Sequence, residues 1–311
     1  MGEAFDPDYG RMTAMLGLEL PNAAAGAQDF ILIPFLSPPV EIIGTPIGTL
    51  GDGIQIWRIT HNGVDTHTIH VHLFNAQIIN RVAWDNAIRP PDLNELGWKE
   101  TFRVNPLQDT ILAFKPVAPT QPFRIPNSIR PLDPTMPLGE PLNGPVGGWK
   151  DISGEPVTVI NHLVNFGWEY LYHCHLLAHE EFDMMHSVIF GIAPDKPIIL
   201  AAVQSGNGNN QRVTLTWTDN STDETSFKVQ RAILATGPWT TITTIPSATG
   251  PGTGSPITYI DTTVARRTTY YFRALATNVV GDTTVYPAPA IGFPNMSLDS
   301  MPSNNMTAST V

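Results

Sequence analysis

Strand-length runs of β-branched, aromatic and other apolar residues, separated by Gly and Pro, recur throughout the chain. Several runs alternate apolar with polar residues, which is the period of a half-buried strand. Gly and Pro contribute 25 and 29 residues and only 14% of residues are charged, so few segments have the charged face of a long amphipathic helix. The pattern predicts an all-β chain. In its first part the runs are residues 30–35, 54–59, 69–74, 110–114, 157–160 and 168–172.

The pattern of runs starts afresh near residues 193–197, and the length of 311 residues suffices for two separate cores. We therefore expect an irregular lead-in, two domains and a polar, disordered tail. Between two strands of the first domain, residues 116–150 form a Pro-rich excursion that we expect at the surface near the functional site. The expected divisions are residues 1–28 for the lead-in, 29–193 and 196–293 for the domains, and 294–311 for the tail.

The second domain has no histidine and consists of short strand runs. Trp217 on an early run and Tyr270 near the start of a late one predict an immunoglobulin-like sandwich with a tyrosine corner. Residues 215–217, 229–231 and 270–281 resemble fibronectin type III domains. Because nothing in it suggests a site, we expect a spacer or docking unit.

Charge and hydropathy limit the possible partners. The net charge of −11 and the pI of about 5.1 argue against nucleic acid and anionic membrane surfaces, since both require a basic patch. No apolar stretch approaches the roughly 20 residues that cross a bilayer. The first six residues have neither the basic start nor the apolar run of a secretory signal. The sequence thus predicts no nucleic-acid partner, no membrane span and no signal peptide in this chain.

Histidines are concentrated in two short runs. In residues 67–72, His70 and His72 are two positions apart and therefore share one face of a strand. In residues 173–175 the same spacing places His173 and His175 on one face and Cys174 on the other. The geometry suits two metal centres on opposite sides of one strand.

Cys174 is the chain's one cysteine, so no disulfide forms within the chain. His179 and Met184 follow it at a spacing that allows the chain to curl back toward the cysteine face. A thiolate, imidazoles and a distant thioether are the ligands of blue copper, whereas a zinc site more often offers several cysteines. The residues therefore predict copper.

The run of residues 173–179, followed by Met184, resembles the C-terminal signature of multicopper oxidases, and residues 67–72 resemble their first histidine signature. Their order and separation are similar to those of the last cupredoxin domain of that family, a Greek-key barrel, in bacterial laccases and bilirubin oxidases. Thr68 stands where the family usually has Pro, and Asp183 where many relatives have Gly. Neither position supplies a ligand.

The resemblance implies a role for each of these residues. Electrons from a reductant would enter at a type 1 copper and pass through Cys174 to a trinuclear cluster that reduces O2 to water. Glu180 matches an acidic position that helps to deliver protons, although it is equally consistent with a solvated surface carboxylate. We expect His61 and His162 to be structural or to donate to a ligand, and His186 to lie at the surface. The implied ligands are His67, Cys174, His179 and Met184 for type 1 copper, His70 for type 2, and His72, His173 and His175 for type 3.

Multicopper oxidases take the other half of the cluster's histidines from an N-terminal cupredoxin domain, and no further paired histidines occur in this sequence. The resemblance therefore implies that such a domain lies in a partner chain or a missing segment. It also implies a periplasmic or extracellular location for the parent enzyme. The reductant stays open among phenols, bilins, Mn(II) and Cu(I). Two alternatives are a type 1 electron carrier without oxidase activity and a copper-carrying extracellular interaction module.

Overall fold

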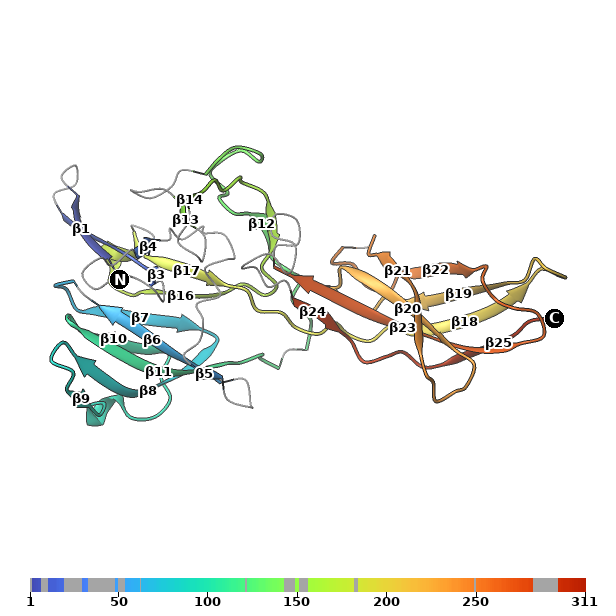
Figure 1. Cartoon of the computed structure of the whole chain (residues 1–311), viewed down its shortest axis with the longest axis horizontal. Coiled ribbons are helices and arrows are strands. Elements are labelled where there is room, and N and C mark those ends of the chain that lie inside the picture. Colours follow the sequence, from blue (N-terminus) through green and yellow to red (C-terminus); the bar gives the residue numbers. More distant parts are fainter. Residues whose placement is uncertain are drawn as a thin grey trace. The chain divides into compact units, whose positions relative to one another are not determined.

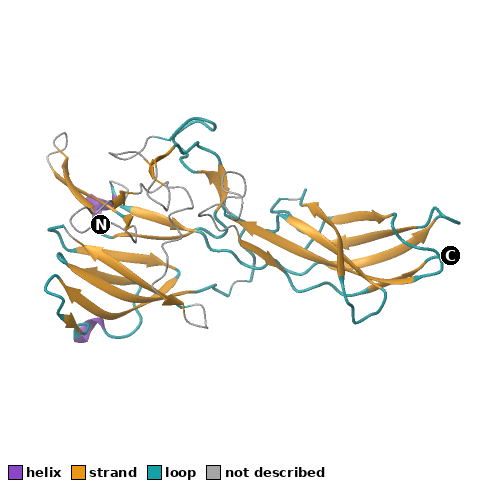
Figure 2. Cartoon of the chain, viewed as in Figure 1, coloured by secondary structure: helices purple, strands orange, loops and turns teal. Residues whose placement is uncertain are grey.

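A computed structural model of the chain describes residues 2–6, 11–19, 30–32, 48–49, 54–61, 63–120, 122–142, 149–150, 156–181, 184–248, 250–281 and 296–311. Regular structure in these ranges is almost entirely β-strand (Figure 2), which confirms the predicted all-β class. The helices described are α1 (Leu177–Glu180) and the single 3-10 turn η2 (Leu93–Glu95). Neither has the length or the apolar content needed to cross a bilayer.

The chain divides into two compact units, and the first comprises Met1–Thr120, Ile129–Phe190 and Gly281–Pro294. Its strands, coloured blue to yellow-green in Figure 1, are β1 (Gly2–Asp6), β2 (Arg11–Met15), β3 (Gly17–Glu19), β4 (Phe30–Leu32), β5 (Gly48–Thr49), β6 (Gln55–His61), β7 (His67–His72), β8 (Phe74–Ala83), β9 (Ile88–Arg89), β10 (Thr101–Val104), β11 (Gln108–Pro116), β12 (Ile129–Pro131), β13 (Trp149–Lys150), β14 (Pro156–Val157), β15 (Leu163–Asn165), β16 (Tyr170–Cys174) and β17 (Met185–Val188).

Two sheets carry the core of the first unit, with strand orders β10-β7-β16-β17 and β5-β6-β11-β8-β9. On β7 the side chains of His67, Ile69 and Val71 are buried, and those between them are not. The buried positions join apolar side chains of the second sheet, such as Leu112 and Phe114, in one core. This alternation directs every second residue of β7 into the core and the others to the opposite face.

The expected run of residues 69–74 is two strands rather than one. Leu73 has a left-handed φ of 61°, which ends β7 at His72 and starts β8 at Phe74. A non-glycine residue seldom adopts this conformation, so the alternating pattern alone did not reveal the break.

The irregular lead-in predicted for residues 1–28 is wrong for its described parts. Strands β1 and β2 pair as an antiparallel hairpin, with Gly2 opposite Met15, and β3 pairs with β4. Leu16, directly after the hairpin, is buried in the core of the first unit. Composition rich in Ala and Gly thus concealed strands that pair through their backbones.

The second unit comprises Gln121–Ser128, Gly191–Val280 and Asn295–Val311. One sheet has the order β18-β19-β22; in the other, of order β21-β20-β23-β24, β25 also pairs with β23. Trp217 and Phe272 are fully buried between the sheets, and the Tyr270 hydroxyl accepts a hydrogen bond from the Ala265 N–H at 3.0 Å. This is the predicted immunoglobulin-like sandwich with its tyrosine corner. The strands are β18 (Ile198–Ser205), β19 (Arg212–Thr218), β20 (Ser226–Ala232), β21 (Thr240–Pro246), β22 (Pro256–Asp261), β23 (Thr269–Val280), β24 (Met296–Asp299) and β25 (Met306–Ser309).

The disordered tail predicted for residues 294–311 is wrong over residues 296–311, because β24 and β25 complete the second sheet along β23. Between the two strands the Ser300 and Ser303 hydroxyls accept hydrogen bonds from β23 N–H groups at 3.0 and 2.9 Å. Asn304 exchanges two hydrogen bonds of 3.0 Å with the backbone of Ile199. The polar side chains that suggested disorder replace backbone partners of the sheet.

Candidate metal centre

The first cluster of possible ligands consists of His67, Cys174 and His179, all of them buried. Cys174 Sγ lies 3.5 Å from His67 Nδ1 and 3.6 Å from His179 Nδ1. The two Nδ1 atoms are 3.2 Å apart. We call these three residues the thiolate group.

Three elements bring the thiolate group together. His67 begins β7, and Cys174 ends the antiparallel neighbour β16, where it lies opposite Ile69. His179 lies on the short helix α1, after which the chain curls back as predicted. The Cys174 N–H donates to the Met184 carbonyl at 2.9 Å, and the Met184 N–H donates to the His179 carbonyl at 3.1 Å. Met184 is fully buried in the same core.

The spacing of the thiolate group suits a first-row metal ion. With imidazole nitrogen and thiolate bonds of about 2.0 and 2.3 Å, a trigonal arrangement separates the ligand atoms by about 3.5–3.8 Å. The observed separations of 3.2–3.6 Å are close to this range. One soft sulfur and two imidazoles match the donor set of a type 1 copper. Burial raises the pKa of the Cys174 thiol, so in the metal-free chain it favours the protonated form.

The second cluster consists of His70, His72 and His173, on the outer face of the β7–β16 pair. His72 Nε2 and His173 Nε2 are 3.1 Å apart, and the rings of His70 and His72 are 4.7 Å apart. The ring of His175 lies 5.5 Å from that of His70 and 5.4 Å from that of His173. We call His70, His72 and His173 the histidine group, with His175 beside it.

The surroundings of the histidine group favour a neutral His72 and a fixed orientation of the His70 ring. Burial, followed by the charges of His70 and His173, lowers the pKa of His72 below its ordinary value. A neutral imidazole is the form that binds a metal. His70 Nδ1 lies 2.8 Å from the Thr101 hydroxyl on β10. Such a contact leaves Nε2 as the nitrogen available for a ligand bond.

Glu180 lies beside the histidine group, with its Oε1 at 3.8 Å from His173 Nδ1. Its side chain is 35% exposed, so it contacts both this imidazole and solvent. Because Nε2 of His173 faces His72, the carboxylate lies near the other ring nitrogen. This position suits either a proton carrier or a solvated carboxylate near the site.

The remaining histidines differ in part from expectation. His61 is fully buried with its ring 4.8 Å from that of His67, and His162 Nδ1 lies 2.6 Å from the Ile160 carbonyl. The surface position predicted for His186 is wrong: its side chain is buried and stacks on Tyr172. Its Nε2 lies 3.3 Å from the carbonyl of Leu16, which the misjudged lead-in supplies.

Two neighbours of the clusters were missed in the sequence. Thr101 contacts His70 because β10 pairs with β7, a register that no local pattern reveals. Asp65 Oδ2 lies 4.0 Å from His179 Nε2, at the edge of the thiolate group. Its position two residues before His67 was a usable signal.

The multicopper oxidase family model matches residues 46–122, which include the three histidines of β7. A laccase from Bacillus stratosphericus is 26% identical over 145 residues, covering 42% of this chain and 19% of that protein. The chain therefore spans about a fifth of the length of that curated relative. Matches among solved structures are more distant.

Two solved structures are also similar to parts of this chain. A multicopper oxidase from Campylobacter jejuni, described as a metallo-oxidase, is 14% identical with a TM-score of 0.27, covering 47% of this chain and 20% of that one. An Fn3-like protein from Clostridium thermocellum is 23% identical with a TM-score of 0.23, covering 37% of this chain and 92% of that one. The family match and the laccase likeness agree with the two ligand clusters on β7 and β16. Both findings support a cupredoxin-like domain of the multicopper oxidase type in the first unit.

Proposed function

We propose that the first unit serves a copper-dependent oxidase that takes electrons from a small-molecule or metal-ion reductant and reduces O2 to water. The thiolate group, with Met184, would hold a type 1 copper, and His70 would bind a type 2 copper. His72, His173 and His175 would bind a type 3 pair. Copper would supply the one-electron chemistry that no side chain in these clusters provides.

The observation that carries the proposal is the placement of two ligand clusters on opposite faces of one strand pair. His173 and Cys174 are neighbours in the chain, yet the first belongs to the histidine group and the second to the thiolate group. A single peptide link therefore connects the two clusters. A pure electron carrier needs the thiolate group alone, so the histidine group favours an oxidase.

Two side chains and the apolar core would act around these clusters. The Thr101 hydroxyl would orient His70, and the core around Cys174 would exclude water from the thiolate. Glu180, between His173 and solvent, would move protons toward the cluster face. The resemblance also supports a periplasmic or extracellular location for the enzyme.

The remaining cluster ligands are proposed to come from an N-terminal cupredoxin domain, in a partner chain or in sequence beyond this one. The histidine group supports this, because His72 is its most exposed member and offers ligand atoms at the surface of the unit. Two more His-x-His pairs facing this surface would complete a trinuclear cluster.

Copper titration of the full chain tests both clusters. Addition of copper should produce the intense thiolate-to-copper absorption of a type 1 site, and Cys174→Ser should abolish it. His72→Ala should leave that absorption intact but lower the copper bound at saturation. His162→Ala, a histidine outside both clusters, should change neither. A colourless copper-loaded chain would overturn the type 1 assignment, and unchanged copper binding in His72→Ala would favour the electron carrier.

A further inference from the structure

Part of the Pro-rich excursion belongs to the second unit. Residues 121–128 cluster with that unit, whereas the chain up to Thr120 and from Ile129 belongs to the first. The described residues of this segment, 122–128, contain no strand, so sheet pairing does not account for their placement. Side chains must hold them.

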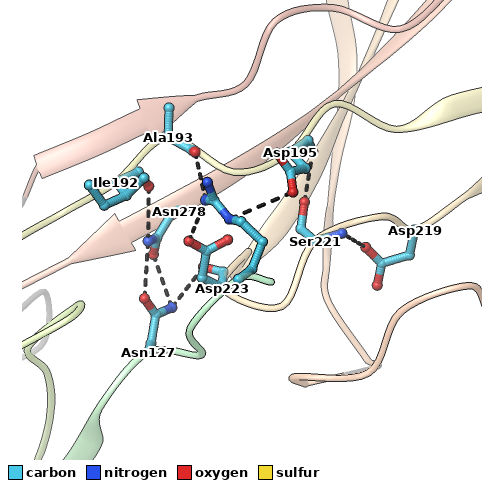
Figure 3. Close-up of polar contacts among 9 residues, drawn as sticks. Asn127, Ile192, Ala193, Asp195, Asp219, Ser221, Asp223 and Asn278 are labelled. Atoms are coloured by element: carbon cyan, nitrogen blue, oxygen red, sulfur yellow. Dashed lines mark hydrogen bonds and ion pairs between the residues drawn. The ribbon is translucent and has the colours of Figure 1, made fainter. Parts of the chain in front are cut away.

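Arg124 makes the first set of contacts, and its partners Ala193, Asp195 and Asp223 are labelled in Figure 3. Its Nη2 donates to Asp223 Oδ2 at 2.7 Å and to the Ala193 carbonyl at 2.8 Å. Its Nε lies 3.6 Å from Asp195 Oδ2. The Asp223 side chain is completely buried and that of Arg124 is 22% exposed. Charge-assisted bonds of this kind are the stronger ones in proteins.

Asn127, three residues further along the segment, makes the second set of contacts. Its amide exchanges two hydrogen bonds of 3.1 Å with the side chain of Asn278 on β23. Its Nδ2 also donates to the Asp223 carbonyl at 2.7 Å. Asn278 in turn donates to the Ile192 carbonyl at 3.3 Å (Figure 3). Residues 122–128 are thus held at two points by one charge and one amide pair.

The buried carboxylate of Asp223 depends on Arg124 for its positive partner. Burial raises the pKa of Asp223, and the adjacent Arg124 opposes that rise. If Arg124 were removed, the segment could stay and leave a buried carboxylate without its cation, or it could leave and lose the Asn127–Asn278 bonds. Either outcome weakens the attachment. The two contacts therefore act together.

We propose that the second unit acts as a clamp on residues 122–128 of the Pro-rich excursion, with Asp223 and Asn278 as the surface that grips them. This assigns the fibronectin-like unit a role beyond that of a spacer. The segment lies between β11 and β12 of the first unit, and pinning it restricts a connection that would otherwise carry the entropy of a long loop. The proposal does not depend on copper.

Limited trypsin digestion of the full chain tests the clamp through the rate of cleavage after Arg124. Of the basic residues between Arg103 and Lys150, Lys115 and Arg130 each precede a proline, which blocks trypsin, so Arg124 is the cleavable one. In the wild type, bound Arg124 should be cut slowly. Asp223→Ala and Asn278→Ala should each speed cleavage after Arg124, on the order of 100-fold for Asp223→Ala, because cleavage follows the population of the released segment.

A matched control lies in the same unit. The Lys228–Asp299 ion pair has the same N–O distance of 2.7 Å as Arg124–Asp223, but its side chains are 27% and 39% exposed. Lys228→Ala should leave the rate of cleavage after Arg124 unchanged.

Two results would overturn the clamp. One is an equal rate of cleavage after Arg124 in the wild type and both variants. The other is cleavage after Arg124 that appears only together with cleavage after Arg231 and Arg273, which lie in β20 and β23. In that case the contacts would support the sandwich itself rather than grip the excursion.

Discussion

The buried carboxylates of the fibronectin-like unit and the thiolate group of the copper-binding unit differ in their polar partners. In the fibronectin-like unit the buried carboxylates each accept a hydrogen bond from a protein donor: Asp219 from the Ser221 N–H, Asp223 from Arg124, Asp261 from Arg231 and Glu224 from Ser247. In the copper-binding unit the ligand atoms of His67, Cys174 and His179 face one another at 3.2–3.6 Å. Each of these carboxylates thus has at least one donor in its own chain, whereas the thiolate group is arranged around a ligand.

The two units therefore differ in what stabilises their buried polar groups. Buried polar groups are tolerated when they are paired, and an incompletely paired set costs free energy. The fibronectin-like unit supplies at least one donor to each buried carboxylate within its own chain. The thiolate group is paired when a metal ion joins the three donors, since metal binding to the native state adds directly to its stability. The units should therefore respond differently to copper, to loss of a charge pair and to pH.

Copper binding should produce the largest difference in stability between the two units. Binding at a metal concentration 1,000 times the dissociation constant stabilises the native state by about 4 kcal/mol. For a unit of this size that raises the unfolding temperature by roughly 8–16 °C. Calorimetry with and without copper should show this increase in the transition of the copper-binding unit alone.

Cys174→Ser is the control for the copper experiment, and its copper-dependent shift should largely vanish. Equal shifts in both transitions would contradict the comparison, because they would mean that copper acts on the whole chain rather than on the thiolate group.

A buried ion pair in the copper-binding unit should behave like those of the fibronectin-like unit. Arg81 donates to both oxygens of Glu95, at 2.6 and 2.8 Å, with side-chain exposures of 7% and 11%. Glu95→Ala leaves a buried guanidinium without its anion and should cost about 3–5 kcal/mol in urea unfolding. The type 1 absorption of the folded, copper-loaded variant should not change.

Arg58→Ala provides the comparison for Glu95→Ala. Arg58 pairs with Asp109 at 3.3 Å, and its side chain is 47% exposed, so its loss should cost less than about 1 kcal/mol. If the two variants lost equal stability, burial would not be what distinguishes these pairs.

The features that the sequence predicted correctly are local ones, and those that it did not predict depend on long-range contacts. The thiolate and histidine groups were found because strand parity places His70 with His72 and separates His173 from Cys174. The single cysteine left one choice for the sulfur ligand. These are local properties of two strands, and the pairing of β7 with β16 then brings them together.

The misjudged features depend on contacts between distant segments. His186 is buried because Leu16 reaches it from the N-terminal segment, and the tail is ordered because Ser300 and Ser303 bind the backbone of β23. The excursion divides between the units because Arg124 meets Asp223, 99 residues further along. Hydropathy and composition carry no information about such partners.

A smaller effect than those of copper and Glu95→Ala concerns charge in the copper-binding core away from the ligands. Tyr170 is buried there, stacked on Phe190, and its hydroxyl donates to the Val117 carbonyl. Burial raises its pKa from 10.0 to about 12. Between these values the unfolded chain loses the proton while the folded chain keeps it, so this contribution to stability is complete below pH 10 and is lost as the pH rises toward 12.

The loss at Tyr170 should amount to about 2 kcal/mol between pH 10 and 12. Urea unfolding over that range should show the decline in the wild type and a smaller one in Tyr170→Phe, and the difference in their phenolate absorbance should titrate near pH 12. An identical decline in both proteins would place the ionising group elsewhere. A steeper decline in the wild type would mean that this core accepts a charged side chain only where a counter-ion or a metal ion compensates the charge. That condition separates the thiolate group from the apolar side chains around it.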